Sequence, residues 1–331
     1  MGRSGKQHIS ESYQTLFRMY RDRLMKNIVN QFIKLKTYIQ LFFLIALNSD
    51  VAVFLKSISA KKAAISQSGL KKFCIPALNC YSCPSAVSSC PIGALQFWLN
   101  DVSMKFALGE KINLAGLYII GFLSLFGGVG GRIACGWICP FGFIQDLTNK
   151  IFKKNIPLPK FSKYIKYITL ALFVIILPTF AFDIALLSPW FCKYICPSGT
   201  LMAGIPLLSI DANLRNTVSY ISLIKFIILG VFIVLFFISR RSFCKTLCPL
   251  GAIWGLFNKI SIIKLNLDKN RCIDCKKCEK VCPMNIEVIK NQNSVECIRC
   301  FECVRVCPTK CLEVKVKNLT TPHPSPKLER E

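Results

Sequence analysis

Residues 272–308 read CIDCKKCEKVCPMNIEVIKNQNSVECIRCFECVRVCP, and this stretch decides what the C-terminal part of the chain can be. It holds two runs of four cysteines spaced C-x2-C-x2-C-x3-C-P, which end at Pro283 and Pro308. Three closely spaced thiolates can bind three irons of one cubane, and the fourth cysteine lies beyond, just before the proline. The pattern therefore predicts two 4Fe–4S clusters.

The expected ligands follow from the exchange of fourth cysteines that this spacing shows in bacterial two-cluster ferredoxins. We expect Cys272, Cys275, Cys278 and Cys307 to bind the first cluster, and Cys297, Cys300, Cys303 and Cys282 to bind the second. Zinc is the alternative, but it needs four ligands per site and does not explain a proline after each run. Cys311 is left over as an ordinary thiol. Residues 263–317 are predicted to form a small α+β ferredoxin domain, followed by a disordered tail, 318–331.

Composition limits the rest of the chain, which has 331 residues, 53% of them hydrophobic and 18% charged, and a formal net charge of +26. A disordered chain and a small disulfide scaffold are both excluded. Haem is not expected, because the two histidines, His8 and His323, lie in the tails and no C-x-x-C-H string occurs. Nucleic-acid binding is not expected either, because no such module is present. We expect the basic residues to face membrane lipid headgroups and an acidic redox partner.

Four hydrophobic segments are long enough to cross a bilayer: Tyr38–Leu55, Ile112–Val129, Ile165–Phe182 and Tyr220–Ile238. Polar residues 48–50 interrupt the first, and its alternative is a short interfacial helix. Lys166 and Lys225 are expected to snorkel to the interface. The sequence thus predicts an α-helical integral membrane domain, 38–262, after a basic cytoplasmic tail, 1–37, with an amphipathic helix over 13–36. Basic loops place both termini in the cytoplasm of a multi-pass protein of the cell membrane, although the lysine-rich loop 56–111 conflicts with this topology.

A repeat links the cysteines of the membrane part, because the string C-P-x-G-x-(I/L) occurs four times: Cys90–Leu95, Cys139–Ile144, Cys196–Leu201 and Cys248–Ile253. Three copies have a second cysteine four residues earlier, and the second and fourth copies match from Arg132 and Arg241 onwards. These two copies are expected on the cytoplasmic side, where they supply a complete cubane set: Cys135, Cys139, Cys244 and Cys248.

The first and third copies are expected on the opposite side, where six thiols are available: Cys74, Cys80, Cys83, Cys90, Cys192 and Cys196. A cluster there would use Cys192 and Cys196 with two of the others, or the four from Cys74 to Cys90 by themselves. Spacing does not choose between these sets. Disulfides are the alternative, because an exterior face can be oxidising.

These motifs resemble those of a known protein family. With the turns Cys135–Pro140, Cys192–Pro197 and Cys244–Pro249 and the tandem cysteine runs, residues 38–312 resemble the membrane polyferredoxins related to NapH, the quinol-dehydrogenase membrane subunit of periplasmic nitrate reductase systems. They also resemble the membrane half of the regulator NosR and the copper-reducing assembly protein CcoG. The chain departs from NapH in its third Cys-x3-Cys-Pro turn and in the loop from Cys74 to Cys90.

The expected function is electron transfer by an iron–sulfur subunit of an oxidoreductase system. Single electrons would pass between a cytoplasmic flavoprotein, ferredoxin or reductase subunit and either the quinone pool or an extracytoplasmic partner. Gln145, Asp146, Asp183 and Asp211 are candidates to hydrogen-bond a quinone, with ordinary solvated loop residues as the alternative. Two other functions stay open: a copper reductase or assembly factor, which the CcoG resemblance implies, and a non-redox membrane protein with structural zinc.

Overall fold

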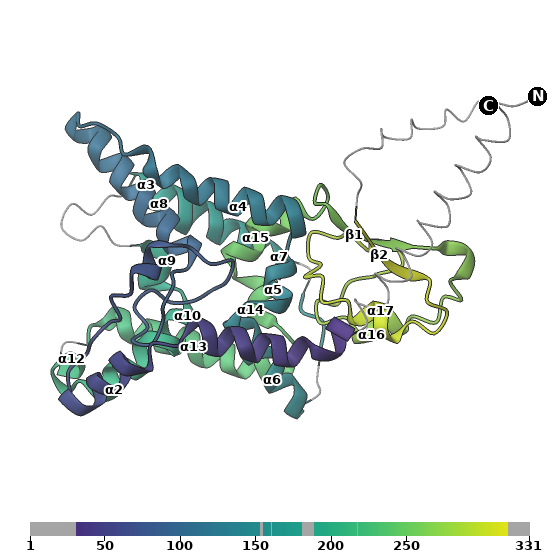
Figure 1. The fold of residues 1–331 in the computed structure, drawn as a ribbon, viewed down its shortest axis with the longest axis horizontal. Coiled ribbons are helices and arrows are strands. Elements are labelled where there is room, and N and C mark those ends of the chain that lie inside the picture. Colours follow the sequence, from purple (N-terminus) through teal and green to yellow (C-terminus); the bar gives the residue numbers. More distant parts are fainter. Residues whose placement is uncertain (1–30, 153–154, 160, 181–188, 217, 317–331) are drawn as a thin grey trace, which may run out of the picture.

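The computed structural model describes residues 31–152, 155–159, 161–180, 189–216 and 218–316, which form a long helical part and a smaller cysteine-rich part (Figure 1). Most of the predicted helix over 13–36 and the predicted tail 318–331 lie outside these residues. The chain enters the described region in a helix, Gln31–Leu47.

The helical part consists of short and medium helices joined by turns and by longer loops, the longest of which lies between α2 and α3. They are α2 Val51–Ala60, α3 Pro91–Leu108, α4 Leu117–Gly130, α5 Ile133–Trp137, α6 Pro140–Phe152, α7 Ser162–Thr169, α8 Leu177–Phe180, α9 Trp190–Tyr194, α10 Pro197–Gly199, α11 Ile205–Ile210, α12 Ala212–Asn216, α13 Tyr220–Ile238, α14 Ser242–Thr246 and α15 Pro249–Phe257. Wider, π-helical turns join α7 to α8 (Leu170–Ile176) and α10 to α11 (Thr200–Gly204). The first of these turns precedes Pro178, which has no N–H to continue the regular ladder.

Two helices are long and apolar enough to cross a membrane, Ser162–Phe180 and Tyr220–Ile238. Gln31–Leu47 and α2 make a third only if they count as one span, because they are bent by 56°. The bend falls on the polar residues 48–50, where Asp50 caps the new helix by accepting from the N–H of Val53. The predicted second segment is a shorter apolar helix, Leu114–Gly130. Two or three spans are therefore found among the described residues where the sequence predicts four.

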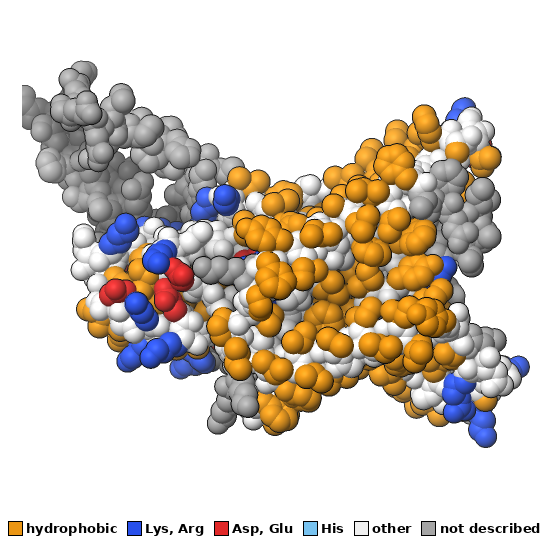
Figure 2. Space-filling model, turned by 180° about the vertical axis from the view of Figure 1, so that it is seen from behind, with side chains coloured by type: hydrophobic (Ala, Val, Ile, Leu, Met, Phe, Trp, Pro, Cys, Tyr) orange, Lys and Arg blue, Asp and Glu red, His pale blue; other side chains and the backbone are white. Residues whose placement is uncertain are grey.

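The surface of the helical part is largely apolar, as Figure 2 shows for the face seen from behind. Large side chains such as Phe106 and Phe180 are 79% and 78% exposed. On this face the charged side chains gather over the cysteine-rich part and at the opposite tips of the helical part. An apolar surface of this extent is unfavourable in water and is typical of contact with lipid. The chain is therefore a membrane protein.

The cysteine-rich part contains two antiparallel strands, β1 Ile263–Leu267 and β2 Leu312–Val316, paired Leu265 to Val314, and two packed helices, α16 Lys277–Val281 and α17 Glu302–Val306. Its two cysteine runs have matching backbones. Positive φ angles of 52° and 50° occur at Asp274 and Arg299, and of 53° and 57° at Lys276 and Phe301, each pair 25 positions apart like the cysteines. Because non-glycine residues rarely adopt this conformation, the match indicates one loop fold used twice.

Candidate metal centres

The inner set, which we define as Cys135, Cys139, Cys244 and Cys248, is brought together by two matching turns. Each turn is one short helix, α5 or α14, followed by a proline that starts the next helix. All four thiols are buried, each at most 7% exposed. Burial raises the pKa of the Cys248 thiol, and the nearby Cys244, Cys135 and Cys139 thiols raise it further. Four thiols from two copies of the repeat thus lie near one another.

Two buried arginines hold these turns in a reciprocal arrangement. Arg132 Nη2 donates to the carbonyl of Cys244 at 3.1 Å, and Arg241 Nη1 donates to the carbonyl of Cys135 at 2.5 Å. Both arginines are 0% exposed, and each is paired with a carboxylate, Glu296 at 3.1 Å and Asp146 at 2.6 Å. The internal match that begins at Arg132 and Arg241 therefore has a structural reason, because each copy clamps the cysteine turn of the other.

The surroundings of the inner set fit a 4Fe–4S cluster. The N–H of Gly251 donates to Cys248 Sγ at 3.3 Å, and Gln145 Nε2 donates to Cys244 Sγ at 3.4 Å. A Cβ atom on Gly251 would lie 2.7 Å from Arg132 Nη2, so glycine permits the close approach of this guanidinium to the turn that carries Cys248. Thiolate ligands with N–H donors to sulfur are typical of such clusters. In the described part of the chain no three Cys, His, Asp or Glu side chains converge closely enough to bind one single ion.

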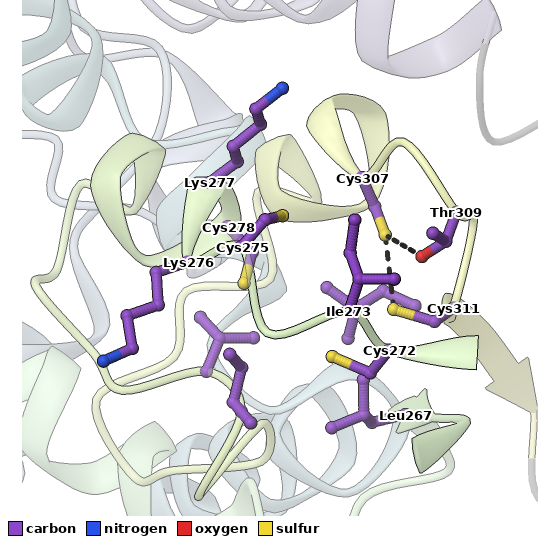
Figure 3. A pocket seen from close by; sticks show the side chains of 13 residues that line it. Leu267, Cys272, Ile273, Cys275, Lys276, Lys277, Cys278, Cys307, Thr309 and Cys311 are labelled. Carbon is purple, nitrogen blue, oxygen red and sulfur yellow. Dashed lines mark hydrogen bonds between the residues drawn. The ribbon is translucent and has the colours of Figure 1, made fainter. Parts of the chain in front are cut away.

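The first-run set, Cys272, Cys275, Cys278 and Cys307, lines one pocket, shown in Figure 3. A fifth thiol also lines it, because Cys311 Sγ lies 3.3 Å from Cys307 Sγ and is buried. Although burial opposes the change, hydrogen bonds from Cys311 and Thr309 lower the pKa of the Cys307 thiol. The sequence predicts an ordinary thiol at Cys311 and gives no sign of this contact with Cys307. No repeat signal could have found it, since Ile286 stands at the matching position of the first run.

The thiols of the second-run set, Cys297, Cys300, Cys303 and Cys282, are also close neighbours. Burial raises the pKa of the Cys303 thiol, and the neighbouring thiols raise it further in the order Cys300, Cys297, Cys282 and Cys278. Cys282, the fourth cysteine of the first run, therefore lies near the second-run thiols. Cys278 belongs to the first-run set, so the two sets are adjacent.

The second run lies directly on the inner set. Trp137 Nε1 donates to the carbonyl of Arg299 at 2.9 Å, and Arg299 Nη1 donates to the carbonyl of Gly130 at 2.9 Å. A Cβ atom on Gly136 would lie 2.5 Å from the carbonyl oxygen of Ile298, so only glycine permits this approach. The backbone of the second-run set is therefore in contact with the helix that carries Cys135.

Cations outnumber carboxylates at this contact. The buried or half-buried cations are Lys36, Arg132, Lys166, Arg240, Arg241, Lys245 and Arg299, and the carboxylates are Asp146, Glu296 and Glu302. A cubane with four thiolate ligands carries net negative charge, which such an excess offsets. Lys166 is 0% exposed and pairs with Glu296. The expectation that Lys166 snorkels to the interface is therefore wrong.

Of the four residues considered as quinone ligands, Gln145 and Asp146 are buried. Gln145 is 0% exposed and lies on the inner set, and Asp146 is 5% exposed and accepts from Arg241 and Arg240. Neither is a solvated loop residue. Asp211 accepts from the N–H of Asn213 at the start of α12, and Asp183 lies outside the described residues.

The six thiols expected on the outer side lie in one neighbourhood. The thiols of Cys196, Cys90 and Cys80 lie near that of Cys192, while Cys83 lies near Cys80 and Cys74 lies near Cys90. Cys74 Sγ lies 3.4 Å from the hydroxyl of Tyr118, and Cys83 Sγ lies 3.4 Å from the hydroxyl of Ser85. None of the 19 cysteines, all of which lie in the described part of the chain, is joined to another by a disulfide bond.

Comparison with known proteins adds two family matches. A family described as a 4Fe-4S binding domain matches residues 88–109, 112–159, 167–209 and 222–268, one segment for each copy of the C-P-x-G repeat. A family described as a 4Fe-4S dicluster domain matches residues 264–308. The protein therefore binds 4Fe–4S clusters, as the cysteine runs predict.

Several curated proteins are similar along much of the chain. An uncharacterised protein of Methanocaldococcus jannaschii is 33% identical over 60% of this chain and 71% of its own length. The putative electron transport protein YccM of Escherichia coli is 32% identical over 47% of this chain and 42% of its own length. The ferredoxin-type protein NapH of Escherichia coli is 25% identical over 57% of this chain and 61% of its own length. No solved structure matches.

Proposed function

We propose that this chain conducts single electrons from a cytoplasmic partner into the membrane, because it belongs to the NapH-like family of ferredoxin-type electron-transport proteins. Each 4Fe–4S cluster can take up and release one electron. The first-run, second-run and inner sets are the proposed ligand sets. Their order in space defines a route from residues 263–316 into the helical part, with the cysteine-rich part and the inner set on the cytoplasmic side.

The observation that carries this proposal is the direct contact between the second run and the inner set. Glu296, next to Cys297, accepts from Arg132, and Arg132 also donates to the carbonyl of Cys244. One buried side chain thus touches both sets. Tunnelling rates fall steeply with distance, so contact between ligand sets is what a one-electron route requires.

The residues around this contact have three roles in the proposed transfer. The buried arginines and lysines stabilise negative charge that would otherwise be costly away from water. The N–H donors of Gln145 and Gly251 hold the sulfur atoms and adjust the potential of the site. Trp137 and the apolar core around it keep water away from the contact.

The outer end of the cysteine-rich part is suited to a redox partner. Cys275 is exposed, and the residues around it include Arg271, Lys276, Lys277 and Lys280, which are exposed as well. A basic rim attracts a partner with an acidic surface and speeds its association at low salt. We therefore place the cytoplasmic partner at the first-run set. A quinone or an extracytoplasmic protein is the proposed partner at the other end of the route.

Anaerobically purified protein in detergent tests the proposal through its iron content and its paramagnetic resonance spectrum. Cys248→Ser should remove about four irons. It should also remove the magnetic broadening that the inner cluster imposes on the second-run cluster when both are reduced. Cys74→Ser is the matched control, because that buried thiol lies in none of these three sets. Zinc in place of iron would refute the proposal, and so would iron content and broadening that are unchanged in Cys248→Ser.

A further inference from the structure

The neighbours of Cys192 select four of the six outer thiols. Burial raises the pKa of the Cys192 thiol, and the nearby Cys196, Cys90 and Cys80 thiols raise it further. Gly199 lies among them, because a Cβ atom there would be 3.6 Å from Cys80 Sγ and 3.9 Å from Cys196 Sγ. These four thiols define the outer set. They come from α9, from the residues that precede α3 and α10, and from the loop before α3.

We propose that the outer set, Cys80, Cys90, Cys192 and Cys196, binds a further 4Fe–4S cluster inside the helical part, and that Cys74 and Cys83 are not ligands. This inference rests on the proposed function, since it extends the same route by one site. In Figure 1, α9 and α10 lie beyond α5 and α14 as seen from the strands, so the outer set is further along that route.

The hydrogen bonds around the outer set reproduce those around the inner set. Gln145 Nε2 donates to the Phe141 carbonyl at 3.2 Å and to Cys244 Sγ at 3.4 Å. Gln96 Nε2 donates to the Ile92 carbonyl at 3.1 Å and to Cys192 Sγ at 3.6 Å. Each glutamine stands six residues after the Cys-Pro cysteine of its own copy and reaches the first cysteine of the copy after next. Copies one and three therefore pair as copies two and four do.

The glycines of the C-P-x-G strings strengthen this equivalence. The N–H of Gly199 donates to Cys196 Sγ at 3.4 Å, as that of Gly251 donates to Cys248 Sγ at 3.3 Å. A Cβ atom on Gly93 would lie 3.8 Å from Cys192 Sγ, so the glycine of the first copy lies beside a sulfur of the third copy. The same device serves both sets, although the sequence around each differs.

One ligand comes from outside the repeat. The first copy has Ala86 where the other copies have their second cysteine, so copies one and three supply only three thiols. The loop before α3 supplies the fourth, Cys80. Beside it, Asn79 is 1% exposed, and its side-chain oxygen is a buried acceptor with no partner among the described residues. The loop from Cys74 to Cys90, in which this chain departs from NapH, thus has a specific role, which is to complete the set.

The same loop connects the two membrane sets. Cys139 of the inner set accepts a hydrogen bond from the backbone of Leu78, two residues before Cys80. Two residues of chain span roughly 7 Å, so the nearest thiols of the two sets lie within roughly 16 Å. Lys225, in the second turn of α13, is the cation near Cys80 and Cys196. Lys225 therefore lies beside the outer set, although the sequence predicts that its side chain snorkels to the interface.

Iron analysis of single serine variants tests the proposal. Wild-type protein should contain about sixteen irons, and Cys80→Ser and Cys90→Ser should each contain about twelve. The matched controls are Cys74→Ser and Cys83→Ser, whose hydroxyls keep the Tyr118 and Ser85 partners, and both should stay at about sixteen. Equal iron in the ligand and control variants would overturn the outer set. So would a disulfide among its thiols in protein denatured without reductant.

Two further results separate this inference from the proposed function. About twelve irons in the wild type, falling to about eight in Cys139→Ser, would overturn the outer set and leave the inner set standing. Unchanged iron in Cys139→Ser would instead refute the inner set.

The glutamines give a second readout if a ligand variant fails to assemble. Gln96→Leu should lower the midpoint potential of one cluster at constant iron, because a donor to sulfur is lost, and Gln145→Leu should lower that of a different cluster. A shift of the same cluster in both variants, or no shift in Gln96→Leu, would overturn the outer set.

Discussion

Glu296 is the side chain whose loss should most directly loosen the contact between the two parts of the molecule. It pairs with Arg132 at 3.1 Å and with Lys166, and both cations are 0% exposed. In Glu296→Gln these two buried cations lose their shared carboxylate. Removing one partner from a buried ion pair costs about 3–5 kcal/mol, because the other charge remains away from water.

This free-energy cost should appear as more frequent local opening of the contact between the second run and the inner set. A change of 3–5 kcal/mol corresponds to an increase of roughly two to nearly four orders of magnitude in the population of the open state. Amide hydrogen exchange across residues 294–300, measured by mass spectrometry of protein in detergent, should rise by that factor. Bound clusters supply negative charge near Arg132, so the lower end of the range applies to fully loaded protein.

A matched surface variant and a second substitution complete the test. Glu287 pairs with Lys290 at 2.7 Å in an exposed position, so Glu287→Gln should cost about 0–1 kcal/mol. Adding Lys166→Met to Glu296→Gln restores the original charge balance and should recover part of the protection. Exchange in Glu296→Gln that equals exchange in Glu287→Gln would refute the reasoning.

Three further predictions concern the same region. Gly136→Ala places a Cβ atom 2.5 Å from a backbone carbonyl, so it should separate the second run from α5 and increase its proteolysis, whereas Gly121→Ala, with open space, should not. Arg241 and Lys36 hold the pKa of Asp146 well below its usual range although burial opposes this, so its stabilising contribution is complete above about pH 4 and disappears below it. Thermal stability should therefore fall below about pH 4, and less so in Asp146→Asn than in the wild type. Cys311→Ser should keep the wild-type iron content, and a loss of about four irons would instead make Cys311 a ligand in place of Cys307.

The cofactor could be predicted from sequence because its ligands are mostly local. Three cysteines within seven residues, and a fourth just before a proline, specify a cubane loop whatever surrounds it. The prediction of 4Fe–4S clusters is confirmed by the family matches to four segments between residues 88 and 268 and to residues 264–308. The resemblance to NapH-like proteins is confirmed as well, because the chain is similar to the ferredoxin-type protein NapH over 57% of its length.

The membrane part could be predicted less well, because hydropathy does not report packing. Residues 38–55 are apolar enough for a span, yet Asp50 caps a new helix there and the chain bends by 56°. Lys166 lies in an apolar helix, where snorkelling is the usual outcome. Its partner Glu296 is 130 positions away, so no local pattern could indicate a buried pair.

The sequence by itself determined the kind of cofactor, the repeat of four cysteine turns and the family. Only the tertiary structure showed which of the six outer thiols lie nearest to Cys192 and how the cysteine-rich part is attached. The physical reason is that a ligand run needs only the reach of one turn, which spacing records. The outer set instead joins Cys80 to Cys196 across more than a hundred residues, through helices that pack only in the folded chain.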